Sequence, residues 1–294
     1  MVADRCFPVS MNELIVNFAP TGMVATRERS PHVPLTPQEI IDSVLEAHAI
    51  GITLAHLHVR DPEGVPTLSP DVYEEILLGI RRDAPDLVLC LSLSGRLEPD
   101  FEPRRAPLGL KGMAKPDMAS LTLGSLNFPG KASINQPDVI VGLAQAMRVA
   151  GILPELEAFD SGMLQVARGL IADGVLCTPC YMNLIFGNRA SAQLDFLDVA
   201  NMTSRLPDSC YSAFGGIGHW QLPANALAVA MGTGVRVGLE DNLYLRRREL
   251  ATNAQLLQRV HRLADLHERA FMTPGRFREL MRLKPGGGEY GTLE

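Results

Sequence analysis

The sequence has no long apolar run and no secretion signal that we can identify. No stretch approaches the ~18 consecutive apolar residues that a membrane-spanning helix needs. The N-terminal segment, MVADRCFPVSMNELIVNF, lacks the apolar core and the small-residue cleavage site of a signal peptide. We therefore expect a protein that does not associate with a membrane and is not exported.

The sequence also has fewer positively than negatively charged residues. The 294 residues include 27 Lys and Arg against 33 Asp and Glu, which gives a formal net charge of −6. Proteins that bind nucleic acid present a cationic face to its phosphates, so we expect no nucleic-acid partner. Five cysteines, an odd number, favour a reducing compartment over a disulfide framework. These features predict a cytoplasmic protein that is long enough to fold without disulfides or metal.

Short β-type runs alternate with longer amphipathic segments along the chain. The eight runs with strand character are residues 14–18, 52–59, 87–93, 118–123, 154–159, 181–186, 212–217 and 235–240. The amphipathic segments between them include 36–51, 69–82, 135–151, 196–206 and 223–232. Several begin with Ser, Thr or Asn beside Pro and end in Gly, as helices do. Eight such units predict a TIM barrel; the alternative, an open doubly wound sheet, lacks its GxGxxG after the first strand.

The chain continues beyond the eighth predicted strand. Residues 246–269 have the pattern of a long, charged amphipathic helix, and residues 274–283 that of a final short helix. The segment KPGGGEYGTLE, residues 284–294, is rich in glycine and predicts a flexible tail. No segment resembles an interdomain linker. We expect an α/β protein, a (β/α)8 TIM barrel with extra C-terminal helices, in which residues 1–294 form a single catalytic domain.

The segment AHLHVRD, residues 55–61, contains two histidines two positions apart. In a strand, His56 and His58 point to the same face, and near the carboxyl end of a barrel strand that face forms the active-site mouth. Neutral imidazoles in this position suit Zn²⁺ or a similar metal. The alternative is that the two histidines are incidental, because His-x-His also arises by chance in a chain with seven histidines.

The segment VRVGLEDN, residues 235–242, forms the last predicted barrel strand. Arg236 and Glu240 lie on one face of that strand, and Asp241 follows its end. Around a closed barrel, this strand and the strand of His56 both lie close to the first strand, so Glu240 could complete a His₂Glu metal site with an open position for substrate. The alternative is an ion pair in which Arg236 and a carboxylate close the barrel floor.

Three other features have a functional and a structural interpretation. Ser92, in the strand end LCLSLSGR, could hydrogen-bond an anionic group or simply end its strand. Cys177 and Cys180 have redox spacing, but a zinc ribbon would need a second cysteine pair, which is absent. His219, before Trp220, could line the active-site mouth or serve in packing.

Several segments, in this order, resemble the β-keto acid cleavage enzyme family, over a span from about Asn17 to Leu266. The matching segments are TGMVATRERSPHVPLTPQEI, AHLHVRDPEG, LSLSG, KPDMASLTLGSLNF, PELEAFDSGML, GIGHWQLP and RVGLEDNLYLRRRELATNAQLL. The resemblance implies a TIM barrel that is a homo-oligomer, expected to be a tetramer, and that binds Zn²⁺. It also implies a reaction between a β-keto acid and acetyl-CoA that gives acetoacetate and a new acyl-CoA.

The resemblance also implies roles for individual residues. His56, His58 and Glu240 match the zinc ligands of the family. Asp241 matches the base that removes the proton between the keto and carboxylate groups. Arg236 and Ser92 match residues that orient this base and the substrate.

One position departs from the family pattern. Where the members that cleave an aminohexanoate carry a glutamate shortly after Thr-Gly, this chain has Val24. A valine cannot pair with a cation, so we expect a substrate without a cationic amine, neutral or apolar at its distal end. We further expect Ser120, Thr122 and Glu157 to help line the substrate pocket.

Two other functions remain open at this point. A metal-dependent TIM-barrel hydrolase also uses His-x-His on a barrel strand, but it needs no CoA and usually has further metal-binding residues on later strands. A non-catalytic barrel would bind a small molecule without turnover. If CoA binds, its phosphates need cations on the loops that follow the strands, and the candidates are Arg60, Arg96, Arg104, Arg105 and Lys111.

Overall fold

The fold was obtained as a computed structural model that describes residues 13–232, 234–284 and 289–290. Eight parallel strands form a closed barrel. In order around the barrel they are β2 (Val16–Phe18), β3 (Leu54–Leu57), β6 (Val88–Leu91), β7 (Met118–Thr122), β10 (Leu153–Ala158), β11 (Cys180–Phe186), β12 (Cys210–Gly216) and β13 (Gly234–Val237). Each of the eight runs with strand character supplies one of these strands. The TIM-barrel prediction is confirmed, and the open sheet is wrong because β13 pairs with β2 and closes the ring.

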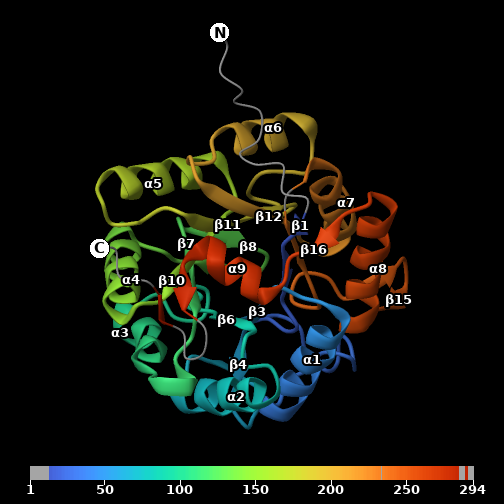
Figure 1. Cartoon of the computed structure of the whole chain (residues 1–294), viewed down its shortest axis with the longest axis horizontal. Helices are drawn as coiled ribbons and strands as arrows, with labels where there is room; N and C mark the ends of the chain where they lie inside the picture. The colour runs from blue at the N-terminus through green and yellow to red at the C-terminus, as the bar shows by residue number, and fades with distance from the viewer. Residues whose placement is uncertain (1–12, 233, 285–288, 291–294) are drawn as a thin grey trace.

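Helices surround the barrel, as Figure 1 shows. They are α1 (Pro37–Ile50), α2 (Pro70–Asp83), α3 (Phe101–Arg105), α4 (Pro137–Ala150), α5 (Ser161–Ala172), α6 (Phe196–Ser204), α7 (Gln221–Met231) and α8 (Asn253–Leu266). The expected sequence signals define their ends. Thr36 and Glu39 form a capping box at the start of α1, and Gly151 ends α4 in the left-handed conformation.

The helix predicted over residues 246–269 is shorter in the structure. Residues Tyr244–Arg246 (β14) and Glu249–Leu250 (β15) form an antiparallel hairpin, and Arg248 has a positive φ of 65° at its turn. Helix α8 begins only after Thr252, which forms a capping box with Gln255. The charged, helix-compatible composition of this segment did not reveal the turn.

Three further hairpins and three short 3₁₀ segments complete the connections within the described residues. The hairpins pair β4 (Val59–Arg60) with β5 (Pro66–Thr67), β8 (Leu126–Phe128) with β9 (Lys131–Ser133), and β17 (Leu283–Lys284) with β18 (Glu289–Tyr290). The 3₁₀ segments are Ala106–Gly109 and Gly112–Ala114, and a third, Gly218–Trp220, precedes α7. Most of the predicted flexible tail, residues 285–288 and 291–294, lies outside the described residues.

The final helix, α9 (Pro274–Met281), closes the end of the barrel where the strands begin. Its Phe277 and Met281 pack in one cluster with Leu54, Val88 and Met118, which start their strands. The adjacent pairing of β1 (Glu13–Leu14) with β16 (Ala270–Phe271) connects this cap to the N-terminal part of the chain. Figure 1 is viewed onto α9, in red at the centre. The opposite end of the barrel is left for a site.

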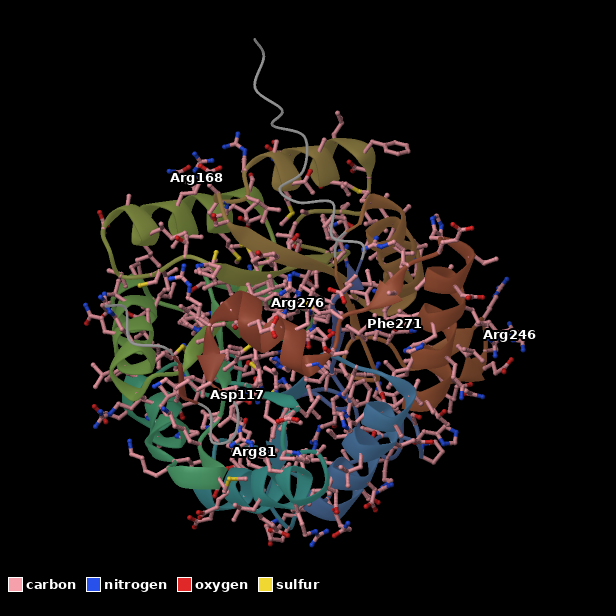
Figure 2. The ribbon with its side chains drawn as sticks, in the orientation of Figure 1. Arg81, Asp117, Arg168, Arg246, Phe271 and Arg276 are labelled. Atoms are coloured by element: carbon pink, nitrogen blue, oxygen red, sulfur yellow. The ribbon has the colours of Figure 1, made fainter. Side chains whose placement is uncertain are left out.

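A buried ion cluster holds this cap in place. Both oxygens of Asp117, which precedes β7, accept from Arg278 of α9 at 2.8 and 2.9 Å, and one also accepts from Arg81 of α2 at 3.0 Å. Figure 2 labels Asp117 and Arg81 beside α9. Among the described residues, no helix is long and apolar enough to cross a membrane.

Candidate active site

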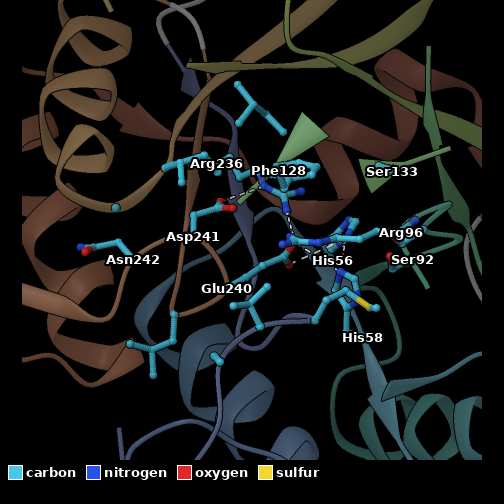
Figure 3. A pocket seen from close by; sticks show the side chains of 18 of the residues that line it. His56, His58, Ser92, Arg96, Phe128, Ser133, Arg236, Glu240, Asp241 and Asn242 are labelled. Carbon is cyan, nitrogen blue, oxygen red and sulfur yellow. Dashed lines mark hydrogen bonds and ion pairs between the residues drawn. The ribbon is translucent and has the colours of Figure 1, made fainter. Parts of the chain in front are cut away.

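A cavity of about 350 Å³ opens where the barrel strands end. Most of the residues that the sequence singled out line it, although they come from segments far apart in the chain (Figure 3). These residues are Val24, His56, His58, Ser92, Thr122, Glu157, Arg236, Glu240 and Asp241. A TIM-barrel active site occupies this end of the strands.

His56, His58 and Glu240 converge on one point of the cavity. The Nε2 atoms of the two histidines are 3.3 Å apart, and Glu240 Oε1 lies 3.2 Å from His58 Nε2. Glu240 Oε2 is 3.8 Å from His56 Nε2. The structure thus brings together the three side chains that the sequence analysis proposed as a group.

The backbone places Glu240 differently from the prediction. The strand expected over residues 235–240 ends at Val237, so Glu240 does not alternate with Arg236 along a strand. Gly238 turns the chain with a φ of 150°, and a Cβ there would collide with the backbone of Ala19. Gly22 leaves room on the other side, because a Cβ on it would overlap the Glu240 side chain. The position of the Glu240 carboxylate therefore depends on Gly22 and Gly238, and not on the alternation of side chains along a strand.

A buried carboxylate that the sequence analysis missed fixes the orientation of His56. Glu155 Oε2 lies 2.5 Å from His56 Nδ1, and its other oxygen accepts from Asn17 Nδ2 at 2.6 Å. Burial alone would raise the pKa of Glu155, but His56, Arg236 and the thiol of Cys90 outweigh it and lower that pKa to about 2. An ionised Glu155 accepts the Nδ1–H of His56 and so fixes the ring with Nε2 toward His58 and Glu240.

Arg236 connects three acids of the site. Its guanidinium donates to Asp241 Oδ2 at 3.0 Å, to Glu240 Oε1 at 2.6 Å and to Glu157 Oε1 at 3.4 Å. Burial and the negative charge of Glu240 raise the pKa of Asp241 to about 6, although Arg236 acts to lower it. The expected contact between Arg236 and a carboxylate is present, but it lies at the active-site end of the barrel and not on the floor.

Two groups of side chains could hold a metal ion: His56, His58 and Glu240, or His56, Cys90 and Glu155. The first group has the spacing of a tetrahedral zinc site, whose ligands at about 2.0–2.1 Å lie about 3.3–3.4 Å apart. Its Glu240 Oε2 is also buried without a hydrogen-bond partner among the described residues.

The second group is less suited to an ion. Both oxygens of Glu155 already accept hydrogen bonds, and burial raises the pKa of the Cys90 thiol, which keeps it protonated. Neither residue lines the cavity. The His56–His58–Glu240 group therefore fits a metal ion better.

The predicted substrate-binding residues divide between two locations. Thr122 donates to Glu157 Oε2 at 2.8 Å within the lining, and Val24 lines the mouth with 43% of its surface exposed. Ser120 differs from the prediction because it is not part of the lining. Its hydroxyl accepts the backbone N–H of Leu93 at 3.0 Å, so it connects two neighbouring strand ends.

Among the candidate cations for CoA phosphates, only Arg96 lines the cavity. Arg60 donates to the carbonyls of Gly22 and Ala25, and the fully buried Arg104 donates to the carbonyl of Leu93, so both support loops. Arg105 pairs with Glu102 on the surface of α3, and Lys111 is exposed outside the lining.

Two other sequence features lie outside the cavity lining. Cys177 and Cys180 flank a turn and are not joined by a disulfide. His219 is exposed beside Trp220, outside the cavity lining.

The residues that sequence reasoning missed carried a signal. Asn17 and Glu155 are polar residues inside otherwise apolar strand runs, and Glu155 precedes Glu157 by two positions. Strand alternation therefore placed both glutamates on the inner face of the barrel. What the alternation did not reveal is that Glu155 reaches His56 across the barrel.

The comparisons with known proteins agree with these motifs. Residues 13–283 match the family described as beta-keto acid cleavage enzyme. A 3-keto-5-aminohexanoate cleavage enzyme of Acetoanaerobium sticklandii is 32% identical over 92% of this chain and 98% of its own length. A 3-oxoadipate:acetyl-CoA acetyltransferase of Cupriavidus necator is 34% identical over 92% of this chain and 94% of its own.

A third relative and a solved structure extend the similarity. A 3-dehydrocarnitine:acetyl-CoA trimethylamine transferase of Rhizobium meliloti is 33% identical, covering 94% of this chain and 99% of its own. The fold is also similar to that of ObcA in a ternary complex with a C4-CoA adduct and oxalate, with a TM-score of 0.77 at 20% identity, over 87% of this chain and 68% of that one. The family match covers the whole barrel, including His56, His58, Glu240 and Asp241. The chain belongs to the beta-keto acid cleavage enzyme family.

Proposed function

We propose that this chain is a zinc-dependent enzyme that condenses a β-keto acid with acetyl-CoA and releases acetoacetate and a new acyl-CoA. The observation that carries the proposal is the convergence of His56, His58 and Glu240 beside Asp241, whose carboxylate Arg236 holds. Names of relatives support the reaction class, since two of them include acetyl-CoA as a co-substrate.

His56, His58 and Glu240 would hold the zinc ion. When bound, Zn²⁺ would act as a Lewis acid toward the keto and carboxylate oxygens of the substrate and so lower the cost of forming an enolate. Glu155 keeps His56 in the tautomer that this role requires.

Asp241 is the base in this proposal. Its carboxylate takes a proton from the substrate carbon between the keto and carboxylate groups. Arg236 donates to Asp241 Oδ2 and so fixes the direction of this carboxylate, and Ser92 orients the substrate from the opposite wall of the cavity. Glu157 accepts from Thr122 and Arg236, which holds Arg236 in place from its other side.

The bonds change in three steps. The enolate carbon attacks the acetyl carbonyl of acetyl-CoA, and the CoA thiolate leaves. That thiolate then adds to the original keto carbon. A retro-Claisen cleavage breaks the bond between the former enolate carbon and the keto carbon, giving acyl-CoA and, after the carbon regains a proton, acetoacetate.

The decisive experiment is an assay of acetoacetate formation by the zinc-loaded protein with acetyl-CoA and a panel of β-keto acids. We expect product only when both metal and acetyl-CoA are present. The His58→Ala variant should lose both bound zinc and product. Hydrolysis of an ester or amide without CoA would instead support the metal-dependent hydrolase, and ligand binding without any turnover would support the non-catalytic barrel.

The substrate proposed here has no cationic amine at its distal end. Val24 lines the mouth where a cation would need a carboxylate. We expect Val24→Glu to improve kcat/KM for a 5-amino-substituted β-keto acid relative to its unsubstituted analogue by about tenfold, the value of one charge-assisted hydrogen bond. Equal use of charged and neutral substrates by the unchanged protein would contradict this assignment.

The assembly and location stay predictions. We propose a homo-oligomer, a tetramer, in the cytoplasm. Sedimentation of the purified chain tests the oligomeric state independently of activity.

A further inference from the structure

Arg96 is a cation of the cavity that the proposed chemistry does not use. It follows the end of β6, in the loop that also carries Ser92 and Ser94, and its side chain is part of the cavity lining. Within the part of the chain that the structure describes, Arg96 forms no ion pair. Arg236, the fully buried arginine of the lining, has three carboxylate partners. The cavity therefore offers one half-buried positive charge without an internal counter-charge.

The position of this guanidinium is fixed by aromatic packing. The Cζ atom of Arg96 lies 4.4 Å from the ring centroid of Phe128, in β8. Phe128 in turn contacts Phe159 edge to face, with ring centroids 5.5 Å apart. An arginine stacked on an aromatic ring still has N–H donors that can bind a planar acceptor with two oxygens, such as a carboxylate. A guanidinium that is already held in place also loses less conformational entropy when the anion binds.

The surroundings of Arg96 strengthen its interaction with a bound anion. Partial burial lowers the pKa of Arg96, because water no longer solvates the charge fully. Arg29, the third arginine of the lining, is exposed, and its interactions are more screened by solvent. Among the arginines of the lining, Arg96 is therefore the one to which an entering carboxylate should bind most strongly.

Arg96 enters the cavity from the wall opposite Asp241. In Figure 3 its label stands beside Ser92, on the other side of His56 from Asp241, and its side chain extends from there toward the centre of the cavity. A small β-keto acid with its reacting end at Asp241 can therefore extend its other end toward Arg96. Phosphates of CoA are a less suitable partner, because the long pantetheine arm separates them from the reacting thioester.

We propose that Arg96 is a specificity-determining residue that binds a carboxylate at the distal end of the substrate, so that the preferred β-keto acid is a dicarboxylic acid. This inference rests on the proposed function. It keeps the expectation of a substrate without a cationic amine, but it replaces the neutral or apolar distal end predicted from the sequence with an anionic one. Phe128 positions Arg96, and the methylene groups of the substrate pack against the apolar part of the lining.

The test compares two six-carbon substrates that differ only at the distal end, 3-oxohexanedioate and 3-oxohexanoate. We expect the unchanged protein to favour the diacid, and Arg96→Gln to lower kcat/KM for the diacid about 10- to 100-fold, as for loss of a charge-assisted hydrogen bond. Turnover of the monoacid should change less than threefold. Arg96→Lys should recover part of the loss, since it keeps the charge without the planar fork.

Arg82→Gln is the matched control, because Arg82 is exposed on α2 and pairs only with its neighbour Asp83. It should leave both substrates unaffected. An equal loss for the two substrates in Arg96→Gln, or a rise confined to the KM for acetyl-CoA, would overturn the assignment; the second result would point to a CoA phosphate as the anion.

A binding measurement separates this inference from the proposed reaction. Calorimetric titration with pentanedioate and pentanoate, which cannot react, should show tighter binding of the diacid by the unchanged protein and equal binding by Arg96→Gln. If the diacid preference is present but no β-keto acid is turned over, the reaction is wrong and the site stands. If acetoacetate forms but neither substrate nor ligand shows the preference, the site is wrong and the reaction stands.

Discussion

The two ends of the barrel both contain buried arginines and carboxylates, but in opposite proportions. At the end covered by α9, two arginines, Arg81 and Arg278, surround the single carboxylate of Asp117. At the open end, the buried guanidinium of Arg236 lies in the field of four carboxylates, those of Glu155, Glu157, Glu240 and Asp241. The cluster around Asp117 therefore has no excess negative charge, whereas the cluster around Arg236 has an excess that a bound cation would balance.

The difference shows how one fold separates stability from chemistry. At the covered end, the arginines also donate to the backbone carbonyls of Met113, Lys115, Asp86 and Leu87, and Arg81 Nε is buried without a partner among the described residues. At the open end, one oxygen of Glu240 is buried without a partner. A buried polar atom without a partner costs stability. Glu240, unlike Arg81, lines the cavity, so a ligand can reach its unpaired oxygen and supply the missing interaction. Four predictions test this contrast.

The largest effect is expected for Asp241→Asn at the open end. Loss of the base should lower kcat for acetoacetate formation about 10²- to 10⁴-fold, because an amide cannot take up the proton. The measurement is turnover, together with deuterium exchange at the acidic carbon of the β-keto acid in the absence of acetyl-CoA. Asp42→Asn, on the exposed surface of α1, is the control. Exchange that persists in Asp241→Asn would show that another group is the base.

At the covered end, Asp117→Asn should cost about 3–5 kcal/mol of unfolding free energy, because two buried arginines lose their counter-charge. Urea unfolding measures this loss. The exposed Asp100, whose side chain makes no cap hydrogen bond to α3, gives the control Asp100→Asn, with a change of about 0.5 kcal/mol or less. A small loss for Asp117→Asn would mean that α9 is held by its apolar contacts alone.

Glu155→Gln examines the support beneath the open end. Without the carboxylate on His56 Nδ1, the affinity for zinc should fall about 10- to 100-fold. Competition with a chelator of known affinity measures it. Glu102→Gln, which removes an exposed carboxylate on α3, should leave zinc affinity unchanged. If Glu155→Gln binds zinc as tightly as the unchanged chain, Glu155 has no role in orienting His56.

The smallest effect is expected away from both ends, at the start of α1. Although burial alone would raise the pKa of Glu39, Arg27 and the N–H groups of Leu35 and Thr36 outweigh it and lower that pKa to about 2. Its ionised form therefore stabilises the folded state at pH values above its ordinary pKa, and this stabilisation is lost as the pH falls toward 2. Because the pair with Arg27 is partly exposed, Glu39→Gln should cost no more than about 1 kcal/mol.

Urea unfolding at pH 6 and at pH 3.5 tests this pH dependence. The difference between Glu39→Gln and the unchanged chain should shrink at the lower pH, where the unfolded state of the unchanged chain takes up the proton. The exposed Glu46→Gln, later in α1, provides the comparison. A cost for Glu39→Gln that stays constant with pH would mean that the carboxylate charge contributes nothing.

The strand pattern predicted most of this architecture because β/α alternation is a local property. Each barrel strand was marked by its own apolar run, and helix starts such as Thr36 were marked by their own capping residues. The α8 boundary was wrong, because a hairpin turn at Arg248 lies within a segment whose charges suit a helix equally well. Ser120 was placed in the pocket on strand alternation, which gives the face of a strand but not the depth along the barrel.

The sequence by itself determined the barrel, the family and most of the side chains that meet in the cavity, since each depends on short motifs such as AHLHVRD and VRVGLEDN. Only the tertiary structure decided how these groups meet. The turn at Gly238 aims Glu240, Glu155 reaches His56 from a strand that is not its neighbour, and Phe128 sets Arg96 in the cavity. Glu155 and His56, and likewise Phe128 and Arg96, lie far apart in the chain, and the fold brings each pair into contact.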